Sequence, residues 1–408
     1  MKSGRILIVG ICIAYARPSL ALDIDGFVDL RAGTSTTDQS WAYGGLGKLR
    51  TDRDHDGLSI GQADLILRGD VSDTISGNLT LNAASEHKPR IDVTEAWLKW
   101  RPIPASAWRT TVRAGAFFPP GSFENDGPGW STSRTLSASA INSWIGEEIR
   151  IKGLELDLFR SGRFANSVHD FGVTAGAFNG NEPAGALLAW RGWSIGDRIT
   201  GLTETLPLPN LPIYDDDGPL YDRQQPRLDD FHQIDNRVGY YASTRYSYGG
   251  NATLMLTHYE NRGNPKALKH GQYAWDTRYD ETSAKWSPTA DSELIAQAMT
   301  GMTMMGYDTV RINFEAWFLL ADYRWGKDML AARYDHFRTR QNDQFPQDNN
   351  DEDGHAVTVA WTHDLSEDMS VVGEWVQLNS TRPERTVFGI SPSQRERSVQ
   401  IALRWRFD

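Results

Sequence analysis

VQIALRWRF, residues 399–407, alternates apolar and polar side chains with a strict period of two near the end of the chain. Every odd position from Val399 to Phe407 is apolar, and the even positions include Arg404 and Arg406. Successive side chains of a β-strand point to opposite faces. The stretch therefore predicts a strand with one apolar, aromatic face and one cationic face.

The same alternation recurs upstream, and almost no stretch after residue 22 has the period of a helix. It is clear in residues 62–71, 78–84, 237–247 and 311–320. We identify about 16 such segments, an even number as in bacterial single-chain membrane barrels. Their predicted centres are Val28, Leu65, Leu81, Ala96, Arg113, Leu156, Val173, Tyr241, Met255, Arg278, Gln297, Phe314, Arg333, Val359, Gly373 and Leu403.

The connections between these segments alternate between short and long. Short ones include residues 72–74 and 249–250, and long ones include residues 119–143 and 179–236. Outer-membrane barrels have short periplasmic turns and long extracellular loops, whereas a β-sandwich has no reason to sort its loops in this way. The sequence predicts an all-β fold, a transmembrane antiparallel β-barrel of about 16 strands with short periplasmic turns and long extracellular loops.

Composition excludes two classes of protein. The net charge is -11, whereas neutralising nucleic-acid phosphates needs a surplus of Lys and Arg, so we expect no nucleic-acid partner. The mean hydropathy of -0.49 excludes a helical membrane protein but not a barrel, in which only alternate residues face lipid. The 15 Trp and 14 Tyr residues suit the two membrane–water interfaces.

Residues 1–21 have the pattern of a secretory signal peptide. Lys2 and Arg5 precede an apolar core at Ile6–Ala16, which is too short to span a bilayer as a helix, and a small-x-small cleavage site ends at Ala21. The alternative is a buried N-terminal strand or helix. Cys12 is the single cysteine, so cleavage would leave a chain without thiols, as suits passage through an oxidising periplasm. We expect residues 22–408 to form one barrel in the outer membrane of a Gram-negative bacterium.

The loop after the fifth predicted strand carries a resemblance to a known family. Residues 117–130 read FFPPGSFENDGPGW, and the architecture of the whole mature chain resembles a bacterial outer-membrane porin, loosely of the phosphate-selective porin O/P type. The resemblance implies a homotrimer and a constriction loop at residues 119–143, with Glu124, Asp126 and Arg134 as its charged residues. Because Arg134 is its only basic residue, the resemblance does not extend to phosphate selectivity. Such chains usually end on an aromatic residue, whereas here Asp408 follows Phe407.

The alternation also predicts which charges face the lumen, because a charge facing lipid costs about 2–4 kcal/mol at the membrane midplane. Rings of charge that line a pore set its ion selectivity, and the mixture of signs here predicts weak selectivity. The alternative is a lumen plugged by its own salt bridges. The predicted pore-lining residues are Arg68, Arg113, Arg237, Arg245, Arg278, Arg311, Arg333, Arg404, Arg406, Asp64, Glu95 and Glu315.

Asp52, Asp54 and Asp56, followed by Gly57, have the spacing of a calcium-binding loop. Position twelve of that loop is Ala63 instead of a glutamate. A solvated acidic loop is therefore the favoured interpretation, and a structural Ca²⁺ is the alternative. We expect no other cofactor.

The sequence has no G-x-S-x-G elbow, no H-E-x-x-H motif and no P-loop. We therefore expect no enzyme. We expect instead a porin-like channel for passive or facilitated diffusion of small hydrophilic solutes, in contact with outer-membrane lipids and lipopolysaccharide. The alternatives are an outer-membrane barrel enzyme, a closed structural barrel and, less favoured, a secreted carbohydrate-binding β-sandwich.

Overall fold

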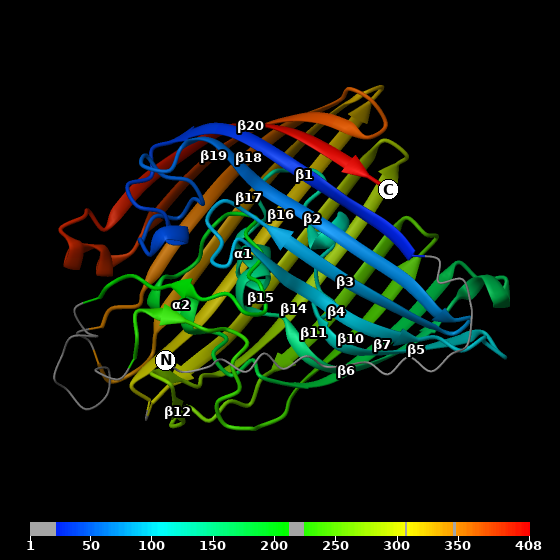
Figure 1. Ribbon diagram of the computed structural model, residues 1–408, viewed down its shortest axis with the longest axis horizontal. Helices are drawn as coiled ribbons and strands as arrows, with labels where there is room; N and C mark the ends of the chain where they lie inside the picture. The colour runs from blue at the N-terminus through cyan, green and yellow to red at the C-terminus, as the bar shows by residue number, and fades with distance from the viewer. Residues whose placement is uncertain (1–21, 212–223, 307, 346–347) are drawn as a thin grey trace, which may run out of the picture.

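The computed structural model describes residues 22–211, 224–306, 308–345 and 348–408 (Figure 1). The predicted signal peptide, residues 1–21, lies outside this part of the chain.

Sixteen antiparallel strands close into one barrel, with β20 hydrogen-bonded to β1 (Figure 1). Each strand pairs with the next barrel strand along the chain. The strands are β1 (Leu22–Ser35), β2 (Gly57–Ser72), β3 (Ile75–Ala83), β4 (Ile91–Trp100), β5 (Trp108–Phe117), β6 (Ile151–Arg160), β7 (His169–Asn179), β10 (Gly239–Tyr248), β11 (Ala252–Glu260), β14 (Asp276–Thr289), β15 (Ser292–Met305), β16 (Val310–Trp325), β17 (Asp328–Gln341), β18 (Glu352–Asp364), β19 (Met369–Thr381) and β20 (Ser393–Phe407).

The sequence prediction of the strands is confirmed, because each of the sixteen predicted centres lies within a different strand of the barrel. Short turns and longer connections alternate along the chain, except that only seven residues join β3 to β4 and only four join β15 to β16 on the long-loop side. The turn between β10 and β11 contains Gly249 and Gly250 at φ of 61° and 76°, a backbone conformation that favours glycine. A single closed barrel also excludes the β-sandwich alternative.

An apolar belt surrounds the outside of the barrel. On β20 the outward side chains include Val399, Ile401, Leu403 and Trp405, all of which are exposed. Several exposed tryptophans, among them Trp325 on β16, lie near the short turns and mark one membrane interface. A closed barrel satisfies its backbone hydrogen bonds internally, so this belt can contact lipid. Among the described residues, no helix has the length and apolar character needed to cross a bilayer.

The long connections contain short elements of their own. Two of them, α1 and α2, are fully buried, and α1 contacts β16 and β17 within the ring of strands (Figure 1). These elements are α1 (Ala140–Glu148), α2 (Ala186–Trp190), the 3-10 turns η1 (Trp41–Tyr43), η2 (Pro128–Trp130), η3 (Gly162–Ala165) and η5 (Pro383–Phe388), and the strand pairs β8 (Leu206–Pro207) with β9 (Arg227–Leu228) and β12 (Leu268–Lys269) with β13 (Gln272–Tyr273).

The inside of the barrel holds a hydrophobic core. Trp144 of α1 makes edge-to-face contacts with Tyr279 of β14 and Phe314 of β16, at centroid distances of 5.6 and 5.4 Å. Trp193, which follows α2, contacts the same Phe314 at 6.0 Å. The wall formed by β14 to β18 therefore packs against protein on its inner face.

This core reverses one prediction from the sequence. On β16 the apolar set, including Phe314, Phe318 and Leu320, points inward and is buried, whereas Arg311 and Glu315 point outward. Arg278 on β14 also points outward. The period of two was right, but assigning the apolar face to lipid was wrong, because here the inner face has a protein core to cover. The outward charges lie near the long-loop ends of these strands, beyond the apolar belt.

Candidate functional site: the lumen of the barrel

The connection between β5 and β6, residues 118–150, lies inside the barrel, where the sequence analysis placed a constriction loop. Glu124 is buried and accepts a hydrogen bond from Arg333 of β17 at 2.7 Å. The same carboxylate accepts from the backbone N–H of Ser139, whose hydroxyl caps α1 by accepting from Asn142 N–H at 3.3 Å. Glu124 thus ties the loop, the start of α1 and the barrel wall together.

The other two predicted loop charges bind each other. Arg134 donates to Asp126 at 3.0 Å and to Asp322 of β16 at 2.9 Å, and it also pairs with Glu293 of β15. Three carboxylates surround one guanidinium, so this end of the loop is held against the wall by charge.

A second inserted segment, residues 198–204, lies against the first residues of β4, where β4 is not paired with β5. Leu202 N–H donates to Val93 O at 2.8 Å, and the N–H and hydroxyl of Thr203 both donate to Asp92 at 2.8 Å. Gly201 packs so closely that a Cβ added to it would lie 2.3 Å from the Cβ of Asp92. The segment is therefore fastened to this side of the barrel.

Arg150 connects this segment to α1. Its buried guanidinium donates to Thr94 O at 3.0 Å and Gly146 O at 3.3 Å, and also to Thr200 O. Thr200 N–H in turn donates to Gly146 O at 3.2 Å. Since α1 contacts β16 and β17, a continuous chain of contacts spans the lumen from β4 to the opposite wall. We call this layer, residues 140–150 and 198–204, the septum.

Asp197 anchors the septum to the wall near β1. It accepts from Arg31 of β1 at 2.5 Å and from Arg50 of the first loop at 2.6 Å. Burial alone would raise the pKa of Asp197, but the two arginines hold it well below its ordinary value. Arg31 also binds Asp29, which pairs with Arg404 of β20 at 2.9 Å. The void left between insert and wall here is only about 10 Å³.

Toward the short-turn end lies an inner cavity of about 520 Å³, which Phe118 separates from Arg150 of the septum. Arg113 pairs with Glu155 at 2.9 Å and lies over the ring of Phe117. Phe118 and Trp130 stack at 4.2 Å on the septum side of the cavity. Its charged lining residues are three cations and three carboxylates: Lys99, Arg113, Arg245, Glu95, Glu155 and Asp157.

On the loop side lies an outer cavity of about 680 Å³. Its described lining includes one buried histidine, His87, whose two ring nitrogens have no hydrogen-bond partner among the described residues. The nearest carboxylate oxygen, on Glu204, is 3.9 Å from Nδ1. The charged residues in the described lining are Glu86, Lys88, Arg90, Arg198 and Arg227.

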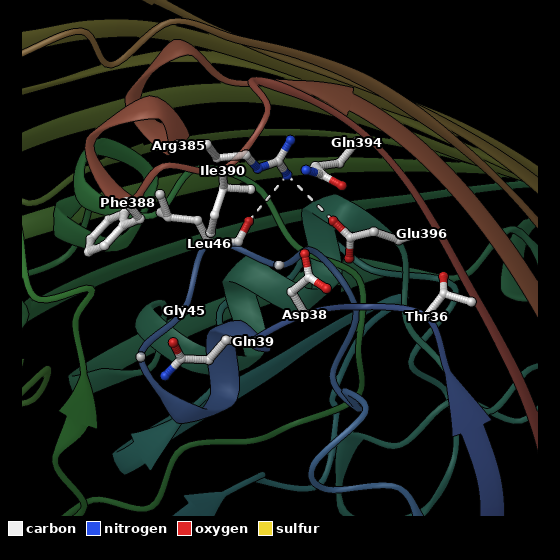
Figure 2. Close-up of a pocket in the computed structure, with 12 residues that line it drawn as sticks. Thr36, Asp38, Gln39, Gly45, Leu46, Arg385, Phe388, Ile390, Gln394 and Glu396 are labelled. Atoms are coloured by element: carbon white, nitrogen blue, oxygen red, sulfur yellow. Dashed lines mark hydrogen bonds and ion pairs between the residues drawn. The ribbon is translucent and has the colours of Figure 1, made fainter.

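A rim latch joins the first and last long loops above the barrel (Figure 2). Arg385 donates to Leu46 O at 3.2 Å and to Glu396 at 3.5 Å. Glu396 also accepts from Thr37 and from Lys48 N–H, both at 2.8 Å. Phe388 and Ile390 cover a cavity of about 80 Å³ beside this latch. The latch fixes the first loop, and with it Arg50, in place.

The predicted pore-lining residues fall into four groups. Glu95, Arg113 and Arg245 line the inner cavity, whereas Asp64, Arg333 and Arg404 point inward but are buried under the inserted loops. Arg68 and Arg406 share the inward faces of Asp64 and Arg404 nearer the short turns. Arg278, Arg311 and Glu315 point outward, and Arg237 is exposed at the long-loop rim before β10, so the lumen assignment of these four was wrong.

The three aspartates that have calcium-loop spacing do not converge in the structure. Asp52 is buried, and its oxygens accept from Ser40 N–H and from the N–H groups of Asp54 and His55, at 2.8 to 3.1 Å. Asp54 and Asp56 are exposed. In the described part of the chain, no three acidic, histidine or cysteine side chains converge as they would around a cation. Asp52 here organises a turn.

The septum could not be predicted from the sequence. Asp92, Arg150 and Asp197 lie in or beside long connections, which have no periodicity from which to read a buried position. Trp97 lines the inner cavity, whereas tryptophans as a class were expected at the membrane interfaces. The one available signal was the unusual length of the connections at residues 118–150 and 180–238.

No protein-family model and no curated protein matches the chain. Solved structures match its fold. The outer membrane channel DcaP of Acinetobacter baumannii is similar with a TM-score of 0.57 at 10% identity, covering 97% of this chain and 100% of that chain. An anion-selective porin from Comamonas acidovorans gives 0.55 at 13% identity, covering 95% and 100%. A loop-deletion mutant of OmpT, an outer membrane protein of Vibrio cholerae, gives 0.54 at 11% identity, covering 96% and 100%.

At these identities the similarity shows the fold, a closed 16-stranded barrel of the outer-membrane porin type. Together with the apolar belt, this fold places the chain in the outer membrane. The narrower resemblance to phosphate-selective porins stays a prediction, as does the expectation that the chain is not an enzyme.

Proposed function

We propose that the protein is an outer-membrane channel for small hydrophilic solutes, and that the septum is its gate. The observation that carries the proposal is a pair of cavities, about 520 and 680 Å³, separated by inserted loop residues. Arg198 of the septum lines the outer cavity, and Phe118 and Trp130, which lie against Arg150 and Gly146 of the septum, line the inner one. Solute enters from one cavity and leaves by the other when residues 198–204 separate from β4.

The charges of the inner cavity support weak ion selectivity. Its lining has three cations and three carboxylates, so neither sign of solute is strongly favoured there. The proposed route passes Arg113 of β5 and Arg245 of β10, two strands that are separated in the wall by β6 and β7.

A closed structural barrel is the second candidate, and the internal hydrophobic core favours it. Trp144, Trp193 and Phe314 form the kind of contacts that hold a protein interior together, not those of a mobile lid. Conductance across a planar bilayer separates the two candidates.

Asp92→Ala tests the gate. The substitution removes the acceptor of both Thr203 donors, so the attachment of residues 198–204 to β4 weakens by about 1–3 kcal/mol. We expect single-channel conductance or open time at least to double. Asp280→Ala is the matched control, because Asp280 is exposed on the outer face of β14. Absence of channels in the wild type and in Asp92→Ala would favour the closed barrel.

A reversible lock sharpens the test. Cysteines replacing Asp92 and Gly201 would begin with Cβ atoms 2.3 Å apart, close enough to form a disulfide after an outward shift of about 1.5 Å. Cys12, in the predicted signal peptide, is the only native cysteine. We expect the oxidised D92C/G201C variant to conduct less than the same variant after reduction, because only the disulfide holds residue 201 against β4.

We also propose a homotrimer, which rests on the resemblance to porins. Native mass spectrometry of the detergent-extracted protein tests it, and a monomeric mass at all concentrations counts against it.

A further inference from the structure

Two arginines on the outward face of β20 lie just beyond the apolar belt. Arg395 and Arg397 are exposed, and the outward positions that follow them begin with Val399 and end with Trp405. Arg397 and Trp405 are separated by about 27 Å along the strand, which is about 21 Å along the membrane normal at a tilt of about 40°. An apolar band is about 25 Å tall, so Arg397 lies at its outer edge.

These two arginines have no carboxylate partner among the described residues. Arg395 Nε donates to Asn379 Oδ1 and Arg397 Nε donates to Gln377 Oε1, both at 3.0 Å, and both acceptors are neutral amides of β19. In the same part of the chain, no partner binds their terminal NH₂ groups. A guanidinium held by its Nε presents these two groups as a preoriented fork for an anion.

Two more arginines continue the patch across the wall. Arg338 and Arg340 of β17 point outward and pair with Asp353 of β18 at 3.0 and 3.4 Å, and Arg338 also pairs with Glu315 at 3.2 Å. We call Arg338, Arg340, Arg395 and Arg397 the outer arginine patch. Four cations face two carboxylates, and the surplus lies on Arg395 and Arg397. Four adjacent strands span about 14 Å, which suits a ligand with more than one anionic group.

Aromatic and apolar residues lie directly below the patch. Trp375 and Val399 are opposite each other on β19 and β20, at the next outward position toward the membrane, and both are exposed. The surface therefore changes from apolar through aromatic to cationic within a few residues. This order matches an amphiphile that has acyl chains in the membrane and anionic groups at its surface.

We propose that the outer arginine patch binds the phosphate groups of lipopolysaccharide in the outer leaflet. The chemistry recognised is a phosphate ester, and the position at the edge of the apolar belt favours a lipid over a free anion. The proposal rests on the outer-membrane location of the barrel and not on the transport activity proposed above.

The test is the affinity of the detergent-purified full-length barrel for lipopolysaccharide, measured by thermophoresis. We expect the double variant R395Q/R397Q to bind about tenfold or more weakly than the wild type. R101Q/R163Q is the matched control, because Arg101 and Arg163 are exposed but lie at the short-turn end, away from the outer leaflet. The control should bind within twofold of the wild type. Heat-modifiable gel mobility confirms that all three proteins are folded.

Two further arms identify the ligand. Dephosphorylated lipopolysaccharide should bind the wild type as weakly as intact lipopolysaccharide binds R395Q/R397Q, and inorganic phosphate at equal phosphate concentration should not compete. Equal affinity of R395Q/R397Q and wild type for lipopolysaccharide would overturn the proposal, and competition by inorganic phosphate would replace the lipid with a free anion. A lower oligomeric mass of R395Q/R397Q with unchanged lipid affinity would assign the patch to a second copy of the chain. Bilayer conductance should be the same for R395Q/R397Q and wild type. The lipid-binding proposal and the channel proposal can therefore fail independently of each other.

Discussion

At the scale of single residues, a charged side chain on the inner face of the barrel is not necessarily exposed to water. Arg404 lies on the inward face of β20 as the alternation predicts, but its guanidinium binds Asp29 at 2.9 Å and Thr132 O at 2.9 Å. The period of two fixes only the face of the strand on which a side chain lies. Whether that face meets water depends on loops that are distant in sequence, such as the one containing Thr132, and no local pattern reports this.

Arg333 and Arg338 on β17 give a prediction at this scale. Arg333 is buried between Glu124 and Asp335, at 2.7 and 2.8 Å, whereas Arg338 points outward with its side chain 39% exposed. Arg333→Met leaves two buried carboxylates without a cation and should cost about 3–5 kcal/mol. Arg338→Met should cost less than about 1 kcal/mol.

The measurement is the urea midpoint of the loss of heat-modifiable mobility in the two variants. Equal shifts would mean that the inward and outward faces of β17 have been assigned wrongly.

At the scale of elements, β16 and β20 show why the two-residue alternation can be predicted correctly while the face that contacts lipid is predicted wrongly. Both strands alternate, but the buried set of β16 is aliphatic and aromatic whereas that of β20 includes Glu396, Ser398 and Arg404. The difference lies in what each strand faces inside the barrel. β16 faces α1 and Trp193, and β20 faces polar loop segments. The existence and order of the strands could therefore be predicted, but the inner lining of β14 to β18 could not.

The loop between β3 and β4 gives a pH-dependent prediction. Burial of the ring and, next, the charge of Arg198 lower the pKa of His87 to about 3, although Glu204 opposes the shift. Arg50 and Arg150 also face the ring and act in the same direction as Arg198. In the unfolded chain the ordinary value is 6.5. As the pH falls from about 6.5 to about 3, the histidine is protonated in the unfolded chain but not yet in the folded protein. The free energy of unfolding therefore decreases by up to about 1.4 kcal/mol per pH unit.

His87→Phe should remove the contribution of histidine protonation to the pH dependence of stability. The unfolding midpoint should then vary less with pH. The substitution should not destabilise the protein strongly at pH 7, because it removes two buried nitrogens that have no hydrogen-bond partner in the described part of the chain. His258→Phe, on the outer face of β11, controls for the introduction of a phenylalanine in place of a histidine. A slope unchanged by His87→Phe would show that the ring is protonated or solvated in the folded protein.

At the scale of the whole molecule, barrel and insert share one core. An empty pore would leave the inner face of β14 to β18 in water, where Phe314 and Tyr279 would be exposed. Instead these side chains contact Trp144 of the insert. The strand pattern predicts a barrel, and the long connections predict that something fills or covers it, but only the folded structure unites the two into one hydrophobic cluster.

The shared core predicts that barrel and insert unfold together. Trp144 is 2% exposed, and Trp144→Ala should cost about 3–5 kcal/mol in the unfolding of the barrel itself, although Trp144 belongs to no strand. Trp317→Ala is the matched control on β16, since Trp317 is 39% exposed and points toward the membrane; its cost should be smaller. Tryptophan fluorescence and heat-modifiable mobility should report a single coincident transition in wild type and in Trp144→Ala. Two separate transitions, with the barrel midpoint unmoved by Trp144→Ala, would mean that the insert is an independent plug, and the gate would then open by unfolding of the insert instead of by release of residues 198–204 from β4.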